Sequence, residues 1–389
     1  MSSIVNQIEE MYGELVDIRE HLHMHPELSF EEFQTSQFIQ NKLKAFGIHD
    51  FKVVCQTGIV GHIGPKEEVI AVRADIDALP ILEANQVSYK SKNEGVMHAC
   101  GHDVHTTCLL GVLKLLKQKE KDLKKGVRFI FQPGEEKLPG GASLLIKEGV
   151  LKNPVPELII GQHVYPELAA GKVGYRPGTY MASCDEIYID FIGKGGHGAL
   201  PQNNVDPIMM SAQFLTGVQQ VVSRKADPKI PTVLSFGHIE GLGATNVIPD
   251  KVSLQGTFRT FNEQWREQAH QHITEFANAT AQMMGGKAIV DIRKGYPFLN
   301  NDEVGTEKCK TISENVLGKK NVVDLDLRMT AEDFSYYSQE IPSVFYRLGT
   351  GNAEMGIIAS VHSPKFDIDP NALKTGVLNM YSLVMEWAS

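Results

Sequence analysis

Four short runs of apolar residues predict buried strands in the first half of the chain and near its C-terminus. They are Val69–Val72, Val127–Phe131, Leu158–Ile160 and Val344–Leu348. Residues 4–46 repeat apolar positions at helical spacing, with Pro26 as a break, and Val104–Leu123 has the same spacing. This alternation of strands and helices indicates an α/β domain whose mixed, mostly parallel sheet is flanked by helices.

The stretch between residues 181 and 294 has a different pattern. Half-buried strands are predicted at Asp185–Ile192, Val233–Ile239 and Lys251–Arg259, and helices at residues 206–224 and 262–284. Two helices beside a small, mostly antiparallel sheet form an α+β pattern. We therefore expect two domains. Residues 1–180 and 295–389 form the larger, discontinuous one, and residues 181–294 form a smaller inserted one.

Length and charge narrow the classes of function. A chain of 389 residues is longer than one hydrophobic core usually serves, which agrees with two domains. A net charge of −9 argues against a general nucleic-acid or anionic-membrane surface, and no apolar run reaches the ~18 residues that span a membrane. The N-terminal segment lacks the regions of a signal peptide, and five scattered cysteines fit a reducing cytoplasm. We expect a cytoplasmic protein with no nucleic-acid or membrane partner.

Polar or glycine-rich segments follow the predicted strands at their carboxyl ends. These segments are Arg73–Asp77, Gln132–Glu136, Gly161–His163 and Gly349–Asn352. In open α/β sheets, ligands bind beyond the carboxyl ends of the strands. The sequence therefore predicts a functional site at this edge of the sheet.

The segment Met97-His-Ala-Cys-Gly-His-Asp103 holds the densest group of metal-binding residue types. Cysteine and histidine are good ligands for zinc and similar metals. The single glycine between Cys100 and His102 suits a turn in which both side chains converge. A capped helix start with a buried cysteine explains the triplet equally well. Cys108, further along the predicted helix, is interpreted as a core residue.

Adjacent carboxylates at Glu135 and Glu136 repel each other unless a cation or proton compensates them. In a loop, one can bind a metal while the other acts on water as a general base, although a solvated acidic turn is the commoner arrangement. Asp77 can orient a ligating imidazole, or it can be a simple turn aspartate. His163 and His362 are weak candidates for metal ligands when each is taken alone.

Two histidine-containing segments remain. His21, His23 and His25 face apart at this spacing on a helix, which favours a structural role. His197 is flanked by glycines and could donate a hydrogen bond to a developing oxyanion, unless the segment is an ordinary glycine-rich turn. The chain has neither of the glycine motifs that cradle nucleotide phosphates.

Taken together and in this order, these segments resemble the di-metal N-acyl-amino-acid amidohydrolases. This family includes hippurate hydrolases, auxin-conjugate hydrolases and aminoacylases, and is related to carboxypeptidase G2. The matching segments are His21–Glu27, Arg73–Pro80, Met97–Asp103, Gln132–Glu136, His163, Gly195–His197 and His362. The resemblance implies a catalytic domain interrupted by a smaller lid or dimerisation domain, and a homo-oligomer that is a dimer or a dimer of dimers.

The resemblance also implies a role for each matching residue of the larger domain. Two divalent metal ions would share Cys100 as a bridging ligand, and the remaining ligands would be His102, Glu136, His163 and His362. Glu135 would be the general base, and Asp77 would orient a ligand. Zinc, manganese, cobalt and nickel all suit this donor set, with zinc or manganese as our first expectation.

The smaller domain would contribute substrate contacts. His197 would help to stabilise the oxyanion, in its own or in a partner subunit's active site. Asn246 and Arg259 are candidates for binding the substrate's carbonyl or carboxylate, although a surface salt bridge is the commoner role for a strand arginine such as Arg259. Gln202 stands where this branch of the family often has histidine, which puts the local substrate contacts in doubt.

We therefore expect metal-dependent hydrolysis of the amide bond of N-acyl amino acids or short peptides. A dipeptidase or exopeptidase and an N-acetyl-diaminopimelate deacetylase are alternatives that would use the same site. A different mechanism would use Cys100 as a nucleophile with His102 or His98. A non-enzymatic protein with structural metals is a further alternative.

Overall fold

The computed structural model describes residues 2–389, which divide into two compact units. The larger unit contains the described residues up to Tyr180, together with Asn300–Asp326 and Asp333–Ser389; the smaller one contains Met181–Leu299 and Leu327–Glu332. We expected the smaller domain at residues 181–294. The segment from Leu327 to Glu332 joins it because the Ala182 N–H donates to the Arg328 carbonyl (3.0 Å).

The larger unit is built on an eight-stranded mixed sheet with strand order β1-β2-β4-β3-β5-β16-β6-β15. The strands are β1 (Phe51–Val54), β2 (Gly58–Ile63), β3 (Val69–Asp75), β4 (Gly126–Gln132), β5 (Ile159–Ala169), β6 (Val173–Tyr175), β15 (Val322–Asp324) and β16 (Ser343–Gly351). The four predicted apolar runs lie in β3, β4, β5 and β16, which are neighbours and run parallel. The expected α/β class with a mostly parallel sheet is confirmed.

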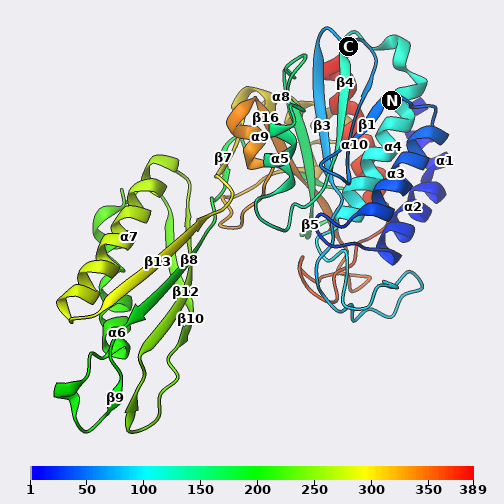
Figure 1. Ribbon diagram of the computed structural model, residues 1–389. Coiled ribbons are helices and arrows are strands. Elements are labelled where there is room, and N and C mark those ends of the chain that lie inside the picture. Colours follow the sequence, from blue (N-terminus) through cyan, green and yellow to red (C-terminus); the bar gives the residue numbers. More distant parts are fainter. Residues whose placement is uncertain (1) are drawn as a thin grey trace. The chain divides into compact units, whose positions relative to one another are not determined.

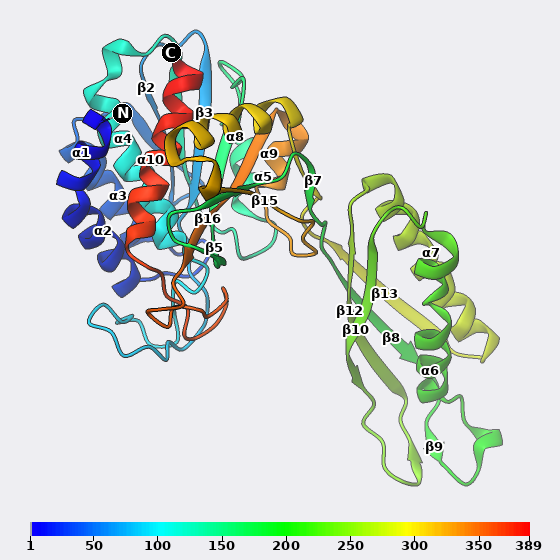
Figure 2. The same ribbon diagram turned by 180° about the vertical axis from the view of Figure 1, so that it is seen from behind.

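Helices cover both faces of this sheet, as Figures 1 and 2 show. They are α1 (Ser2–Glu10), α2 (Tyr12–Met24), α3 (Phe33–Ala45), α4 (His102–Gln118), α5 (Gly141–Lys147), α8 (Glu303–Leu317), α9 (Ser335–Glu340) and α10 (Asn371–Ala388). α4 and α10 pack on one face around fully buried Val72, Leu113 and Val377. α4 begins two residues before the predicted start at Val104, so that His102 is its first residue. None of the helices described between residues 2 and 389 is long and apolar enough to cross a membrane.

The smaller unit has its own core and a four-stranded antiparallel sheet with strand order β10-β12-β8-β13. Its elements are β8 (Asp185–Ile192), β9 (Gly196–His197), α6 (Pro207–Gly217), β10 (Thr232–Glu240), β11 (Val247–Ile248), β12 (Lys251–Thr260), α7 (Glu263–Met283) and β13 (Lys287–Lys294). The helix expected over 206–224 ends at Gly217, and a separate π turn follows at Val221–Lys225. Strand β13 was not predicted. A further two-stranded sheet pairs β7 (Gly178–Met181) with β14 (Leu299–Asn301).

Strand β5 shapes the edge of the sheet at which the candidate site lies. Its pairing with β3 ends at Arg73–Gly161, whereas its pairing with β16 continues past Val164 to Ala169. The interpretation that His163 ends a strand is therefore wrong, because β5 continues for six residues beyond it. His163 lies where β5 has lost its β3 neighbour, which leaves that side of the strand open to other side chains.

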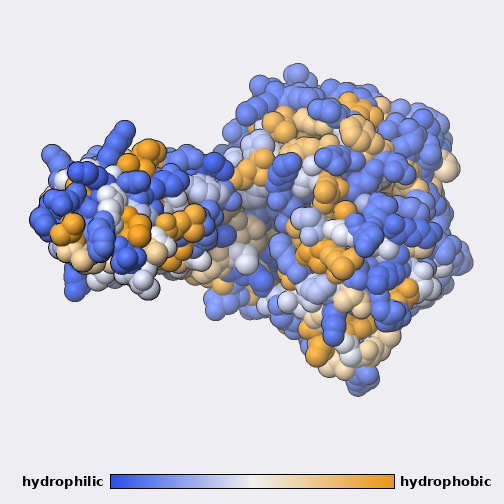
Figure 3. All heavy atoms as spheres, turned by 60° about the horizontal axis from the view of Figure 1, so that its bottom comes forward, coloured by the Kyte–Doolittle hydropathy of each residue, from blue (hydrophilic) through white to orange (hydrophobic). Residues whose placement is uncertain are grey.

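Two long loops emerge at this end of the larger unit, over residues 76–101 and 352–370. Figure 3 turns this end toward the reader, and apolar and polar side chains share its surface. Leu82, Met355 and Ile358 are exposed apolar residues of these loops.

Candidate metal centre

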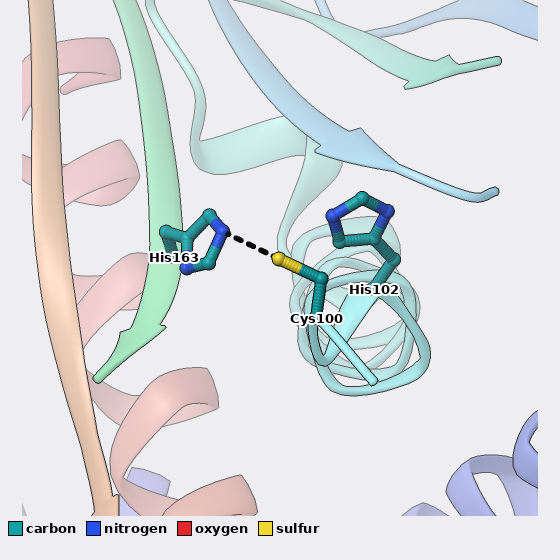
Figure 4. Close-up of side chains that lie close together, drawn as sticks. All are labelled: Cys100, His102 and His163. Carbon is teal, nitrogen blue, oxygen red and sulfur yellow. Dashed lines mark hydrogen bonds between the residues drawn. The ribbon is translucent and has the colours of Figure 1, made fainter. Parts of the chain in front are cut away.

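Cys100 lies at the centre of two groups of potential metal ligands. In one group its thiol accompanies His102 and His163, and in the other it accompanies Glu136 and His362; the ligand atoms of each group lie within 4.8 Å of one another. The Cys100 Sγ is 3.3 Å from Nε2 of His163, as Figure 4 shows, and Glu136 Oε1 is 3.2 Å from Nε2 of His362. The structure thus brings all five predicted ligands together around one thiol.

Gly101 allows Cys100 and His102 to converge. Its φ of 78° is in the left-handed region, which favours glycine, and helix α4 starts at the next residue. A Cβ atom at position 101 would lie 2.6 Å from a methyl group of Val164. The turn expected from the Cys-Gly-His spacing is present, and the close approach of β5 requires a residue without a side chain.

Hydrogen bonds fix how the two buried histidines face the thiol. Nδ1 of His163 donates to the Val164 carbonyl (2.8 Å), and Nδ1 of His102 lies 3.2 Å from Asp77 Oδ1. Both rings therefore present Nε2 as the unprotonated nitrogen when neutral. Nε2 of His102 is buried and has no hydrogen-bond partner among residues 2–389; its ion-pair contact with Asp75 is long, at 3.7 Å. A buried ring nitrogen in this state fits a metal ligand.

The charges of the site also fit divalent cations. Burial alone would lower the pKa of His102, but Asp75, Asp77 and Glu136 outweigh it and raise the pKa to about 10. Burial and the carboxylates of Glu136, Glu135 and Asp75 hold the pKa of the Cys100 thiol well above its usual value. The carboxylates therefore favour positive charge at this point, and divalent cations would replace the protons.

Glu135 and Glu136 have different partners, as expected for adjacent carboxylates with separate roles. Glu135 is buried, and its Oε1 accepts from the Asp333 N–H (3.3 Å). The Asp333 carboxylate is held in turn by Arg73 (2.9 Å) and Gln132 (2.8 Å). Glu136 faces His362, and its N–H donates to Asp77. One oxygen of each carboxylate and one ring nitrogen of His102 also lie within 4.8 Å of one another.

Sequence reasoning missed two buried residues beside the site. Asp75 Oδ1 lies 2.5 Å from Nδ1 of His105, and Asp75 Oδ2 accepts from Arg73 (2.6 Å). Together with His102, Asp75 and His105 form a third group of potential ligands. The signal for Asp75 was present, because it ends β3 two residues before Asp77. His105 could have been found from its position one helical turn after Gly101.

The three histidines near the N-terminus contact other side chains, but the prediction that all of them face apart is wrong, because His21 and His25 are one helical turn apart and lie together. His23 is fully buried, and its Nδ1 lies 2.7 Å from Asp103. His21 stacks on Phe38 and lies against His25, with centroid distances of 4.2 and 4.6 Å. None of the three belongs to a group of potential metal ligands among the described residues.

Three predicted substrate contacts lie in the smaller unit. His197 is exposed, and its Nδ1 accepts from the Ala199 N–H (3.0 Å), so the proton of the neutral ring is on Nε2. The Gly198 N–H donates to the Asn246 carbonyl (2.8 Å), which brings Asn246 next to His197. Arg259 forms no ion pair with any described carboxylate, and its Nε donates to Thr257 Oγ1 (3.2 Å). The surface salt bridge that is the alternative role for Arg259 is therefore absent from the described part of the chain.

The nucleophile alternative finds a geometric partner but unsuitable electrostatics. Neither base named in that alternative, His102 or His98, is hydrogen-bonded to the thiol among residues 2–389. The imidazole in contact with Cys100 is that of His163 (3.3 Å), and burial holds the pKa of this ring well below its usual value while the thiol pKa is raised. A thiolate–imidazolium pair requires the opposite shifts.

Comparisons with known proteins agree with this site. Residues 71–386 match the model of Peptidase family M20/M25/M40. An N-acetyl-L-cysteine deacetylase from Bacillus subtilis is 40% identical over 92% of this chain and 85% of its own. An IAA-amino acid hydrolase, ILR1-like 4, from Arabidopsis thaliana is 39% identical over 94% of this chain and 84% of its own.

A solved structure extends the likeness to the whole fold. The YXEP protein of Bacillus subtilis, described as a dinuclear metal binding peptidase of the M20 family, has a TM-score of 0.82 and 32% identity over 98% of this chain and 99% of its own. The resemblance found in the motifs is confirmed, and the relatives are named as hydrolases. The chain belongs to Peptidase family M20/M25/M40 and is a hydrolase of that family.

Proposed function

We propose that this enzyme hydrolyses the amide bond of N-acyl amino acids or short peptides with two divalent metal ions. The observation that carries the proposal is the Cys100 thiol, which is shared by two groups of ligand atoms. Cys100, His102 and His163 would hold one ion, and Cys100, Glu136 and His362 the other. Relatives named for deacetylation of N-acetyl-L-cysteine and for hydrolysis of N-acyl-L-amino acids support this substrate class.

The ions would supply Lewis acidity, which lowers the pKa of water from ~15.7 toward ~7 and polarises a carbonyl group. The Glu135 carboxylate takes a proton from the attacking water and returns it to the leaving amine. Its burial and the Asp333 N–H keep it in one orientation for both transfers. Asp77 holds the His102 ring in the required tautomer.

The smaller unit supplies the proposed substrate contacts. The Nε2–H of His197 would donate to the developing oxyanion, as its Nδ1 is already occupied by the Ala199 N–H. Asn246, next to it, would bind the carbonyl group. Arg259 forms no ion pair with a carboxylate among residues 2–389 and would bind the carboxylate of the released amino acid.

Zinc or manganese is the proposed metal, with cobalt and nickel also compatible with sulfur, nitrogen and oxygen donors. We also propose a reducing, cytoplasmic location, since all five cysteines are free in the structure. A dimer or dimer of dimers is proposed for the assembly, with support from exposed Ile239 and Leu242 in the smaller unit.

A matched pair of variants tests the mechanism. Glu135→Gln should lower kcat by roughly 10²–10⁴-fold while both metals stay bound, because it removes only the proton carrier. Glu136→Gln changes the neighbouring carboxylate and should instead lose metal, as measured by elemental analysis. Substantial activity in Glu135→Gln would show that the base is assigned wrongly.

A substrate panel tests the reaction itself. N-acetyl amino acids, N-acetyl-diaminopimelate and dipeptides should separate amidohydrolase activity from the deacetylase and dipeptidase alternatives. Chelation should abolish turnover, and added metal should restore it. If the metal-loaded enzyme fails on the whole panel, the proposed function is wrong.

A further inference from the structure

His362 has a backbone conformation that a non-glycine residue rarely adopts. Its φ is 63°, in the left-handed region, and its N–H donates to the Ala99 carbonyl (2.8 Å). This conformation brings its Nε2 to 3.2 Å from Glu136 Oε1. Strained backbone of this kind persists only where the surrounding structure holds it.

The chain that follows His362 is attached at three successive points to the loop after β3. The Pro364 carbonyl accepts from the Ala84 N–H (2.8 Å), and the Phe366 carbonyl accepts from Asn85 Nδ2 (2.9 Å). Asp367 Oδ2 accepts from the Tyr89 hydroxyl (2.7 Å). The two loops lie side by side at the lower end of the larger unit in Figures 1 and 2.

One guanidinium joins this segment to the start of helix α4. Arg19, on α2, donates from Nη2 to Asp367 Oδ1 and from Nε to Asp103 Oδ2, both at 3.0 Å. Asp103 is fully buried and directly follows His102, while Asp367 lies five residues after His362. Arg19 is 3% exposed, so its fork links the two ligand-bearing segments away from solvent.

His362 depends on this linkage more than the other ligands do. Its side chain is 52% exposed, whereas Cys100 and His163 are each 6% exposed and are fixed by the core around them. A half-exposed imidazole is located chiefly by its backbone. The backbone of His362 is held by Ala99 on one side and by the anchored segment ending at Asp367 on the other.

We propose that Arg19, Asp103 and Asp367 form an ionic clamp that positions His362 opposite Cys100. Arg19 and Asp367 are then positioning residues for the ion held by Cys100, Glu136 and His362, and not for the ion held by the buried histidines. This inference rests on the proposed two-metal function. Of the two ions, the one bound by half-exposed His362 would then depend on the Arg19–Asp367 ion pair, which lies outside the metal site.

Metal titration of the purified protein tests the clamp. Metal-free protein is titrated with Zn²⁺ alone in a calorimeter, and retained metal is measured after dialysis. The wild type should bind two equivalents. Asp367→Asn should keep one equivalent at wild-type affinity and bind the other roughly 10–100-fold more weakly, as expected when a residue that orients a ligand is changed. His362→Ala should weaken the same ion, and excess Zn²⁺ should restore activity to Asp367→Asn.

Two further variants separate positioning from stability. Arg128→Lys is the matched control, because Arg128 is a buried arginine that holds another loop through the carbonyls of Val150, Asn153 and Pro154. It should lower the melting temperature without changing metal affinity. Tyr89→Phe removes one hydrogen bond to Asp367 but no charge, and should lower the affinity for the same ion by a smaller factor. If Asp367→Asn does not fold, the metal affinity of Tyr89→Phe tests the clamp instead.

The outcomes distinguish the two proposals. If the wild type binds fewer than two equivalents, the proposed two-metal function fails. If the wild type binds two equivalents of Zn²⁺ and Asp367→Asn binds both ions with wild-type affinity, the clamp is only structural and the inference is wrong. Equal weakening of both ions would also overturn it.

Discussion

Asp77 holds two candidate ligands at once, because Oδ1 lies 3.2 Å from Nδ1 of His102 and Oδ2 accepts from the N–H of Glu136 (3.0 Å). The Ser29 hydroxyl donates a third hydrogen bond to it (2.6 Å). Burial alone would raise the pKa of Asp77, but these hydrogen bonds outweigh it and hold the pKa below its usual value. An ionised carboxylate beneath the site therefore sets the orientation of ligands from two separate loops.

Asp77→Asn should weaken metal binding by roughly 10–100-fold, because an amide cannot accept from both His102 and Glu136. Competition with a chelator of known affinity measures the change. Ser29→Ala removes one hydrogen bond to Asp77 but keeps the carboxylate, and should have a clearly smaller effect. Wild-type metal affinity in Asp77→Asn would contradict the orienting role.

Much of this arrangement was predictable because strands that are buried on both faces need continuous apolar runs. The four runs identified β3, β4, β5 and β16, and their carboxyl ends led to Asp77 and Glu135. The spacing in Cys-Gly-His predicted the turn at Gly101. These features depend on residues close together in the sequence or on a general rule for parallel sheets.

Other features depend on contacts that no local pattern contains. Arg19 and Asp367 are 348 positions apart, and their pairing requires helix α2 and the C-terminal loop to meet. The apolar run ends at Ile160, but strand β5 does not end there. The strand continues because its backbone pairing with β16 extends beyond the apolar residues. Strand β13 was missed because it lies at the edge of its sheet and buries only Ala288, so its apolar alternation is weak.

Gly101→Ala should lower both stability and metal content. The left-handed φ of 78° costs about 1–3 kcal/mol for a residue with a side chain, and the new methyl group would meet Val164. Urea unfolding of the metal-free protein measures the loss. Gly13→Ala is the control, because a methyl group at this position of helix α2 would meet no other side chain within 4 Å, and it should change stability by less than about 1 kcal/mol. Equal stability of the two variants would exclude strain at Gly101.

Arg259→Ala should raise KM selectively for substrates that carry a free carboxylate. Hydrogen bonds to charged groups contribute about 1.5–3 kcal/mol, which corresponds to an increase of roughly 10–100-fold. An N-acetyl amino acid and its primary amide form the substrate pair, and Arg259→Lys keeps the charge without the planar fork. If both substrates lose the same factor, Arg259 does not bind the carboxylate.

Glu32 should make the stability of the metal-free protein depend on pH. It is fully buried, and its Oε1 accepts from the N–H of Gly134, in the loop that carries Glu135. Burial and the negative charge of Asp77 raise the pKa of Glu32 from 4.5 to about 7. The folded state then binds a proton that the unfolded state has released, so this contribution is complete below pH 4.5 and is lost as the pH rises to about 7.

Glu32→Gln imitates the protonated acid, because its amide oxygen still accepts from Gly134 and the Thr57 hydroxyl can accept from the amide. Relative to the wild type, this variant should gain stability as pH rises, by about 3 kcal/mol in total across the window. Urea unfolding at intervals between pH 5 and 8 measures the difference. Adding Asp77→Asn to both proteins should move the window to lower pH, because it removes one cause of the raised pKa. Parallel stability curves for Glu32→Gln and the wild type would show that Glu32 keeps the same charge in the folded and unfolded states.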